Sequence, residues 1–158
     1  MRIVVDGGAW SNQRGFGRFT RELVGALVAH GRHQYTLVVD SQTDATSLPA
    51  GLAVVRAALR HAPSHAAAAD GYRGPFDLLR MSRTLASTPG EVLFFPCTYT
   101  YVPVFTAKRI VSGIHDTIAE RYPALIFPSA RARLFWTLKT RAALAQSARI
   151  VTVSRSMP

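Results

Sequence analysis

The sequence predicts an α/β fold: a Rossmann-like parallel sheet with helices on both faces. Short runs of β-branched and aromatic residues alternate along the chain with longer segments that have helical periodicity. Several of the short runs are apolar throughout, which is typical of strands that are buried on both faces of a parallel sheet. Strands that alternate with helices in this way are joined by right-handed crossovers.

Six of the short runs are predicted to be strands. They comprise residues 3–5, 35–39, 52–55, 92–95, 109–114 and 150–153. The run at 92–95 reads Val-Leu-Phe-Phe and ends at Pro96, so we expect it to be fully buried. No internal repeat interrupts this order, and one domain over residues 1–158 is expected.

Two amphipathic helices are predicted in the first half of the chain. In residues 17–30 one face carries Phe19, Leu23, Ala26, Leu27 and His30, and the opposite face carries Arg18, Arg21 and Glu22. Gly31 is expected to end that helix. In residues 76–86 the expected buried contacts are Leu78, Leu79, Met81 and Leu85. A loop is expected at residues 61–74, between the strand at residues 52–55 and this second helix.

A third helix is predicted from Ser129, a good N-cap residue, to about Ser147. One of its faces carries Leu134, Leu138, Ala142 and Ala145, with Phe135 at the edge. Trp136 lies on the other side, among cations. A tryptophan there fits either a membrane or partner surface, or a second buried contact.

The composition excludes several classes of protein. The chain has 158 residues and 48% of them are hydrophobic, which suits a folded domain. Its single cysteine, Cys97, excludes an intramolecular disulfide framework and fits a reducing, cytoplasmic compartment. Its apolar runs are far shorter than the roughly 20 residues that span a bilayer. The N-terminus reaches Asp6 too soon for a signal-peptide core.

The charge is strongly basic and unevenly placed. Lys and Arg number 19 against 9 Asp and Glu, for a net charge of +10, and no acid follows Glu120. Such a segment fits an anionic partner, including a peripheral contact with the inner membrane surface, but it also fits an arginine-rich proteome. Nucleic-acid binding rests on charge alone, because no recognition helix or stacking motif accompanies it, and we expect none.

The candidate site lies where strands end, since ligands of open parallel sheets bind beyond the carboxyl ends of the strands. Asp6, a glycine-rich turn from Gly7 to Gly17, the pair His115-Asp116, and Ser154 all follow predicted strands.

The glycine-rich turn is a candidate anion site. Gly15 and Gly17 would let backbone N–H groups approach a phosphate at the start of a helix, between the cations Arg14 and Arg18. The dinucleotide fingerprint is not met, because Thr20 stands where its third glycine belongs. Glycines that are needed merely to make the turn would give the same pattern.

His115 and Asp116 also have two interpretations. A histidine at this edge can donate to a substrate oxygen or transfer a proton near neutral pH. Alternatively, His115 bonds a neighbouring backbone group and Asp116 caps the next turn. Asp6 likewise has either a role at the site or a structural role in its own turn. Ser154 is expected first of all to cap a helix.

Metal and nucleophile sites are not expected. His61 and His65 are four residues apart, but Pro63 between them prevents the helix that would align them. Cys97 follows Pro96 with no basic partner nearby in the sequence, so we expect a small buried residue.

Three segments, taken in order, resemble the family 4 (group 1) glycosyltransferases. They are the strand ending in Asp6 with the turn Gly15-Phe16-Gly17-Arg18-Phe19, the segment Ile114-His115-Asp116 followed by Tyr122-Pro123, and Arg149-Ile150-Val151-Thr152-Val153-Ser154. The resemblance covers almost the whole chain. It implies a GT-B architecture, in which two Rossmann-like domains transfer a sugar from a nucleotide-sugar with retention and without an essential metal or other cofactor.

In that family this segment is the N-terminal domain, which binds the glycan or lipid acceptor. By analogy, Gly15 and Gly17 would lie against the donor diphosphate, and His115 would face the donor sugar near the reacting centre. Asp6, Arg18 and Asp116 would shape the cleft. Tyr99 and Tyr101 could stack on a sugar ring or simply pack.

The sequence departs from the family pattern in two places. Ala148 replaces an acid that usually precedes the last strand. The donor domain, with its glutamates seven residues apart, is missing: the glutamates here are Glu22, Glu91 and Glu120. We therefore expect half of an active site, inactive by itself, whose uncovered face could make the chain dimerise. The alternative is a stand-alone Rossmann-like module that holds an anionic lipid or a protein partner through its basic C-terminal third.

Overall fold

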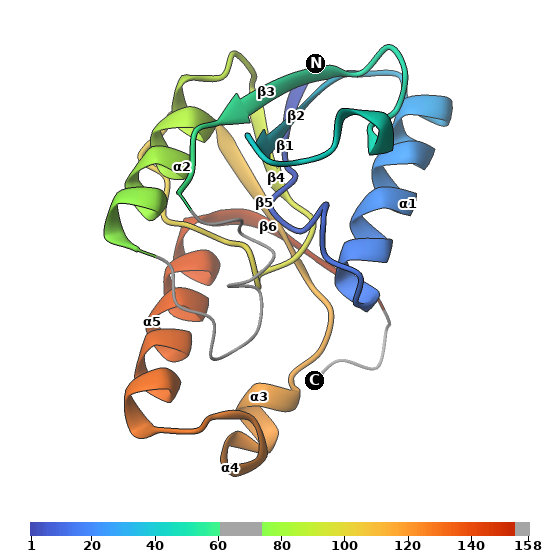
Figure 1. Ribbon diagram of the computed structural model, residues 1–158. Helices are drawn as coiled ribbons and strands as arrows, with labels where there is room; N and C mark the ends of the chain where they lie inside the picture. Colours follow the sequence, from blue (N-terminus) through green and yellow to red (C-terminus); the bar gives the residue numbers. More distant parts are fainter. Residues whose placement is uncertain (61–73, 154–158) are drawn as a thin grey trace.

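One parallel sheet of six strands forms the centre of the computed structural model, which describes residues 1–60 and 74–153 (Figure 1). The strands run in the order β3-β2-β1-β4-β5-β6. They are β1 (Arg2–Asp6), β2 (Gln34–Asp40), β3 (Ala53–Ala57), β4 (Val92–Phe95), β5 (Arg109–Ile114) and β6 (Ser147–Thr152). Every neighbouring pair is parallel, so the predicted fold class is confirmed.

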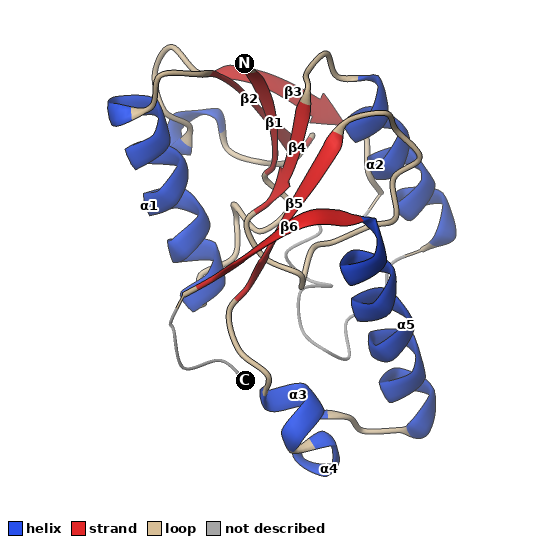
Figure 2. Cartoon of the chain, turned by 180° about the vertical axis from the view of Figure 1, so that it is seen from behind, coloured by secondary structure: helices blue, strands red, loops and turns tan. Residues whose placement is uncertain are grey.

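Helices lie on both faces of the sheet. Helix α1 (Gly15–His30) covers one face, and α2 (Pro75–Ser87) and α5 (Ala130–Gln146) lie on the other (Figures 1 and 2). Ser129 caps α5 as expected, because its Oγ accepts a hydrogen bond from the Ala132 N–H at 3.2 Å. Three short elements were not predicted, since four residues or fewer show no periodicity. They are η1 (Ala45–Ser47), α3 (Ile118–Arg121) and α4 (Pro123–Ile126).

The core is unequal on the two faces. Between the sheet and α2 and α5, the buried side chains form one large cluster that includes Met81, Leu93, Phe95 and Ala143. On the α1 face the buried cluster is Val5, Trp10, Val24, Leu37 and Val39. Those residues belong to β1, β2, α1 and the turn between β1 and α1. The other half of the α1 face, over β4 to β6, is therefore only partly covered by described residues.

The strands on that half of the sheet are not buried on both faces. In β4, Leu93 and Phe95 are buried, whereas Val92 and Phe94 are only half-buried. In β6, Ile150 is 46% exposed and Val151 is 49% exposed. The expectation of a fully buried strand at residues 92–95 was therefore wrong, because no described helix packs over this part of the α1 face.

The predicted buried faces of the helices also need correction. Helix α1 buries Gly17, Thr20 and Val24; Val24 belongs to the cluster on the sheet, and Gly17 lies against the turn that precedes the helix. Of the residues predicted to share its core face, Phe19, Leu23 and Leu27 are half-buried, and Ala26 and His30 are exposed. In α2, Met81 and Leu85 are buried as expected, but Leu79 is 47% exposed.

The prediction for α5 is confirmed for one of the two interpretations of Trp136 and is wrong for the leucines. Its buried residues are Trp136 and Ala143, so the tryptophan is a buried contact rather than a surface group. Leu134 and Leu138 are 56% and 53% exposed.

The loop predicted at residues 61–74 lies outside the described residues except for Gly74, and so does Ser154. None of the helices in the described part has the combination of length and apolar composition that crossing a membrane requires.

Candidate functional site

The predicted site residues meet at the carboxyl edge of the central strands. There β1 ends at Asp6, β4 at Phe95 and β5 at Ile114. Strand order reverses between β1 and β4, and ligands of such sheets bind at the edge where this reversal occurs. The loop after β1 leads to α1, and His115 follows β5 directly.

Asp6 is a buried link between two of these loops. It is 1% exposed. Its Oδ1 accepts a hydrogen bond from the Gly8 N–H at 3.1 Å, and its Oδ2 accepts one from the Thr100 hydroxyl at 2.5 Å. The carboxylate therefore ties the glycine turn to the loop after β4. Asp6 therefore holds the two loops at the edge of the sheet in place, and its carboxylate does not face solvent.

The turn between β1 and α1 is held against the start of the helix. The Arg21 guanidinium donates to the carbonyl oxygens of Trp10 and Asn12 at 2.5 and 2.9 Å. A Cβ added at Gly17 would lie 2.0 Å from the Asn12 carbonyl oxygen, so only glycine fits. A Cβ added at Gly15 would meet nothing within 4 Å. The two glycines thus differ: packing requires Gly17, and it does not require Gly15.

The positive end of α1 is not neutralised by its own residues. The N-cap is Arg14, whose side chain makes no cap hydrogen bond, and the first turn contains no acid. Arg14, Gly15 and Arg18 are all exposed. The helix dipole and two guanidinium groups therefore give this corner of the molecule a positive potential that favours an anion.

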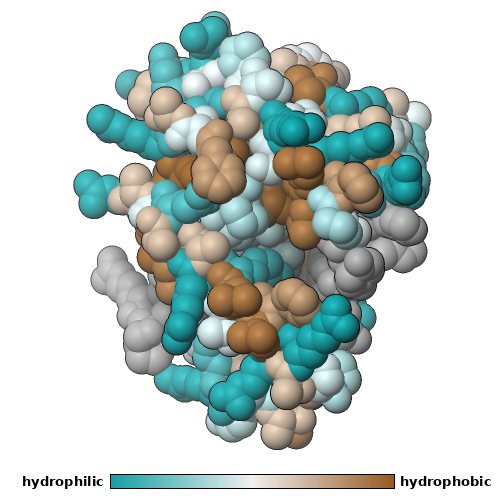
Figure 3. Space-filling model, turned by 90° about the vertical axis from the view of Figure 1, so that its left-hand side faces the viewer, coloured by the Kyte–Doolittle hydropathy of each residue, from teal (hydrophilic) through white to brown (hydrophobic). Residues whose placement is uncertain are grey.

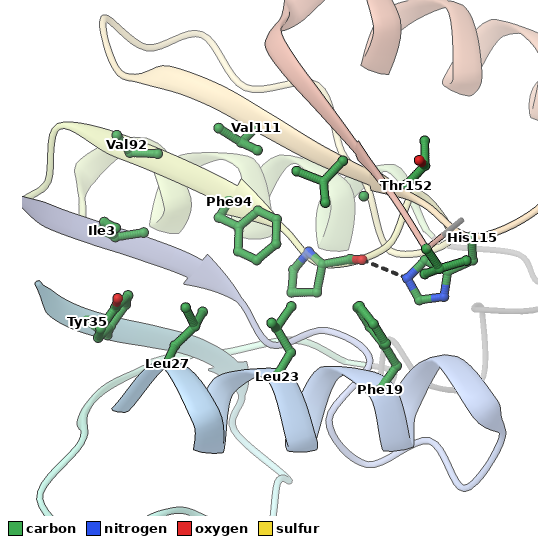
Figure 4. A pocket seen from close by; sticks show the side chains of 14 residues that line it. Ile3, Phe19, Leu23, Leu27, Tyr35, Val92, Phe94, Val111, His115 and Thr152 are labelled. Carbon is green, nitrogen blue, oxygen red and sulfur yellow. Dashed lines mark hydrogen bonds between the residues drawn. The ribbon is translucent and has the colours of Figure 1, made fainter. Parts of the chain in front are cut away.

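His115 is fixed beside the first turns of α1. One ring nitrogen, Nε2, lies 2.9 Å from the Pro96 carbonyl oxygen (Figure 4). The ring also packs edge-on against Phe19, with 4.4 Å between the ring centroids. Since a carbonyl can only accept, Nε2 carries a proton and donates it to this bond, and Nδ1 is the ring nitrogen that this bond does not use. The interpretation that His115 bonds a neighbouring backbone group is thus confirmed for Nε2. This bond does not involve Nδ1.

Asp116 caps the next turn, which was the simpler of its two interpretations. Its Oδ1 accepts a hydrogen bond from the Ile118 N–H at 3.1 Å. Burial, followed by the negative charge of Asp116, raises the pKa of Tyr99 to about 12. The Tyr99 hydroxyl therefore stays protonated at neutral pH beside the carboxylate.

A column of aromatic rings, which the sequence analysis did not predict, stands at the same edge. Phe16 stacks on Tyr99 with 5.1 Å between centroids and 12° between planes, and Tyr99 in turn contacts Trp136 at 5.1 Å. The Lys139 ammonium lies 4.4 Å from the centroid of the Trp136 ring. These residues come from distant parts of the chain, so no local pattern could reveal the column. Tyr101 is buried and its hydroxyl bonds Gln146 at 2.5 Å, so it is a packing residue.

An apolar groove of about 290 Å³ runs from this edge along α1 (Figure 4). One wall is the half-buried stripe Phe19, Leu23 and Leu27 of α1. The opposite wall is the uncovered surface of β4 to β6, and His115 lies at one end. The apolar stripe that the sequence analysis assigned to the core of α1 therefore lines an open groove.

The structure thus brings together all six predicted site residues but gives them different environments. Gly15 and Arg18 are on the surface, Gly17 and Asp6 are buried, and His115 and Asp116 are half-buried. Within residues 1–60 and 74–153 no group of three or more His, Cys, Asp or Glu side chains could hold a metal ion. The pair His61 and His65 lies outside those residues.

Comparisons with known proteins give little further guidance. No family model matches this chain, and no curated protein does. Among solved structures, a short-chain dehydrogenase/reductase of the wide type from Veillonella parvula, in complex with NADP, is similar with a TM-score of 0.44 and 12% sequence identity. The alignment covers 96% of this chain and 67% of that one.

Proposed function

We propose that this chain is the acceptor-side half of a retaining glycosyltransferase of the GT-B type, which transfers a sugar from a nucleotide-sugar to a glycan or lipid acceptor. A second Rossmann-like domain would bind the nucleotide. The proposal rests on the three sequence segments that resemble the family, together with the convergence of Gly15, Arg18 and His115 at one edge of the sheet.

The start of α1 is suited to the leaving group of such a reaction. As the bond between the sugar carbon and the diphosphate oxygen breaks, negative charge collects on the diphosphate. A helix end that carries roughly half a positive charge stabilises that charge without having to reorganise. Arg14 and Arg18 are exposed on either side of Gly15 and add to the same potential.

His115 is suited to hold the donor sugar. Its Nε2–H is committed to the Pro96 carbonyl, and its ring is fixed against Phe19, so Nδ1 has a defined position. A nitrogen lone pair in that position accepts a hydrogen bond from a sugar hydroxyl. A residue so held contributes to rate by orientation, because little freedom is lost when the sugar binds.

The observation that carries the proposal is the environment of Gly15. This glycine is exposed, and no packing contact within 4 Å of the missing Cβ explains it. Close approach of a ligand to the backbone gives a reason for its presence that the fold itself does not supply.

The test is sugar transfer by the protein encoded by the complete gene. Release of nucleoside diphosphate is measured with a panel of UDP-, GDP- and ADP-sugars, for the parent protein and for Gly15→Val and His115→Gln. Loss of one donor contact that acts in the transition state lowers kcat by about 100-fold or more. Both variants should retain the thermal stability of the parent protein.

The isolated chain provides a second test of the proposal. Residues 1–158 alone should show no transfer and no specific nucleotide-sugar binding if they are half of a site. Transfer by the purified 158-residue chain, or full activity of Gly15→Val in the complete protein, would overturn the proposal.

A further inference from the structure

We propose that the outward face of α5 docks on the surface of an anionic lipid bilayer. This surface is made of Leu134, Phe135 and Leu138 with Arg131 and Arg141 at its two ends, and is called the α5 surface below. The proposal is independent of the proposed transferase activity, since it concerns a different face of the molecule.

The α5 surface exposes large apolar side chains that no described residue covers. Leu134, Phe135 and Leu138 are 56%, 57% and 53% exposed. Single exposed apolar residues are common, but three within about one and a half turns of one helix mark an interaction site. Figure 3 looks at the side of the molecule that carries α2 and α5, and shows hydrophobic side chains on the surface interspersed with hydrophilic ones.

The stripe lies opposite the buried side of the helix. The buried residues of α5 are Trp136 and Ala143, which are seven residues apart and therefore share one side. Leu134 and Leu138 are four residues apart and share another, about half a turn away. Leucine and phenylalanine beside arginine are the residue types with which a protein surface enters the membrane interface.

The charge of the α5 surface favours an anionic partner. Helix α5 contains no acidic residue, and none follows it in the sequence. Arg131 and Arg141 are exposed and lie one turn before and one turn after the apolar stripe, about 15 Å apart along the helix. The Arg131 guanidinium also lies 5.4 Å from the centroid of the Phe135 ring, so charge and apolar surface are presented together.

The same charges disfavour a second copy of this chain as the occupant. Two α5 surfaces packed on each other would bring four arginines together with no acid on either helix to neutralise them. Like charges that face each other across an interface are strongly unfavourable. An anionic bilayer, in contrast, gains about 1 kcal/mol for each Lys or Arg near it, which is about a fivefold gain in affinity.

The test is co-sedimentation of the 158-residue chain with phosphatidylcholine vesicles, with and without phosphatidylglycerol. We expect the chain to pellet only with the phosphatidylglycerol vesicles. Binding should fall as salt rises from about 0.1 to 0.5 M, because the Debye length shortens over that range. No sugar donor is present, so the result does not depend on the proposed enzymatic activity.

Matched variants assign the binding to the α5 surface. Arg131→Gln with Arg141→Gln should weaken binding about 25-fold, at roughly fivefold for each arginine. The control, Arg2→Gln with Arg32→Gln, removes the same charge from two exposed positions elsewhere and should change binding far less. These four residues are exposed, so none of the changes should unfold the chain; circular dichroism checks this.

The apolar contribution is tested in the same way. Leu138→Gln should weaken vesicle binding about tenfold or more. The control Val28→Gln lies on α1, on the other side of the sheet, and should bind like the parent chain (Figure 1).

Three results would overturn the proposal. They are equal binding to neutral and anionic vesicles, binding that neither the arginine pair nor Leu138→Gln reduces, and a dimer in solution that Leu138→Gln dissociates while vesicle binding is absent. The third result would identify the α5 surface as a contact between copies of the chain.

Discussion

Replacing Gly17 by alanine should damage the chain where replacing Gly15 does not. The two glycines are separated by one residue at the start of α1, and the sequence alone treats them as equivalent. In the structure, a methyl group at Gly17 would lie 2.0 Å from the Asn12 carbonyl oxygen and 2.9 Å from that of Ala9. At Gly15 the same group would be in open space.

The loss of stability in Gly17→Ala can be estimated from the shift that the added methyl group forces on the Asn12 carbonyl. Contacts of a Cβ atom under 3.0 Å are essentially never seen, so the Asn12 carbonyl would have to shift by about 1 Å. That shift disrupts the hydrogen bond from Arg21, which is 2.9 Å long and is worth about 1.5–3 kcal/mol because the donor is charged. Overpacking adds about 1–3 kcal/mol, and the better helix propensity of alanine returns about 1 kcal/mol. We expect Gly17→Ala to lower the free energy of unfolding by about 2–4 kcal/mol.

Thermal unfolding followed by circular dichroism measures this directly. For a chain of this size, 1 kcal/mol shifts Tm by about 2–4 °C, so Gly17→Ala should lower Tm by about 5–15 °C. Gly15→Ala is the matched control and should leave Tm unchanged or raise it slightly, by up to about 1 kcal/mol in stability. Equal Tm values for the two variants would refute the reasoning, because they would show that the turn does not pack against Gly17.

Further predictions concern buried groups and the groove. The buried Cys97 thiol, whose pKa is raised chiefly by burial, should react with a thiol reagent at pH 8 only as fast as the chain unfolds; prompt reaction in the folded chain would contradict its position. Tyr99 and Tyr101 each have a pKa raised from 10.0 to about 12, mainly by burial, so the native state favours their protonated forms. Stability should therefore be lost as the pH rises from 10 to 12, and less steeply in Tyr99→Phe, as ultraviolet titration and urea unfolding will show. The groove along α1 should bind the dye ANS, and Leu23→Asp should reduce that fluorescence more than Leu134→Asp does.

The order of the strands and helices could be predicted because each depends on local sequence. Runs such as residues 35–39 and 109–114 are β-branched and end at polar residues, and both are strands in the structure. The helix N-cap at Ser129 and the helix end at Gly31 depend on groups within a few residues, and both are confirmed. Local patterns therefore gave the fold class and the position of the edge where the strands end.

The buried faces of the helices could not be predicted in the same way. Periodicity finds an apolar stripe, but which stripe is buried depends on what packs against it. In α1 the contact with the sheet is made by Val24, and Gly17 packs against the preceding turn, while Phe19 and Leu23 line a groove. In α5 the small residue Ala143 joins the core, Trp136 is buried against Tyr99 and Phe127, and Leu134 and Leu138 are left exposed.

The candidate site was predictable in its parts but not in its arrangement. The sequence placed Asp6, Gly15 and His115 after strands or at a helix start, and the topology brings them to one edge. It did not distinguish the structural role of Asp6, which bonds Thr100 across 94 positions of the chain, from the open environment of Gly15. The spacing of residues along the sequence cannot predict long-range contacts of that kind.

The measurement that tests the central claim most directly is the reading frame beyond the codon for Pro158. If this chain is the acceptor-side half of a GT-B enzyme, the frame should continue for about 150–200 residues, the length of one more domain. That segment should encode a second α/β domain with two glutamates seven residues apart and basic residues for the donor phosphates. A stop codon directly after residue 158 would contradict the claim.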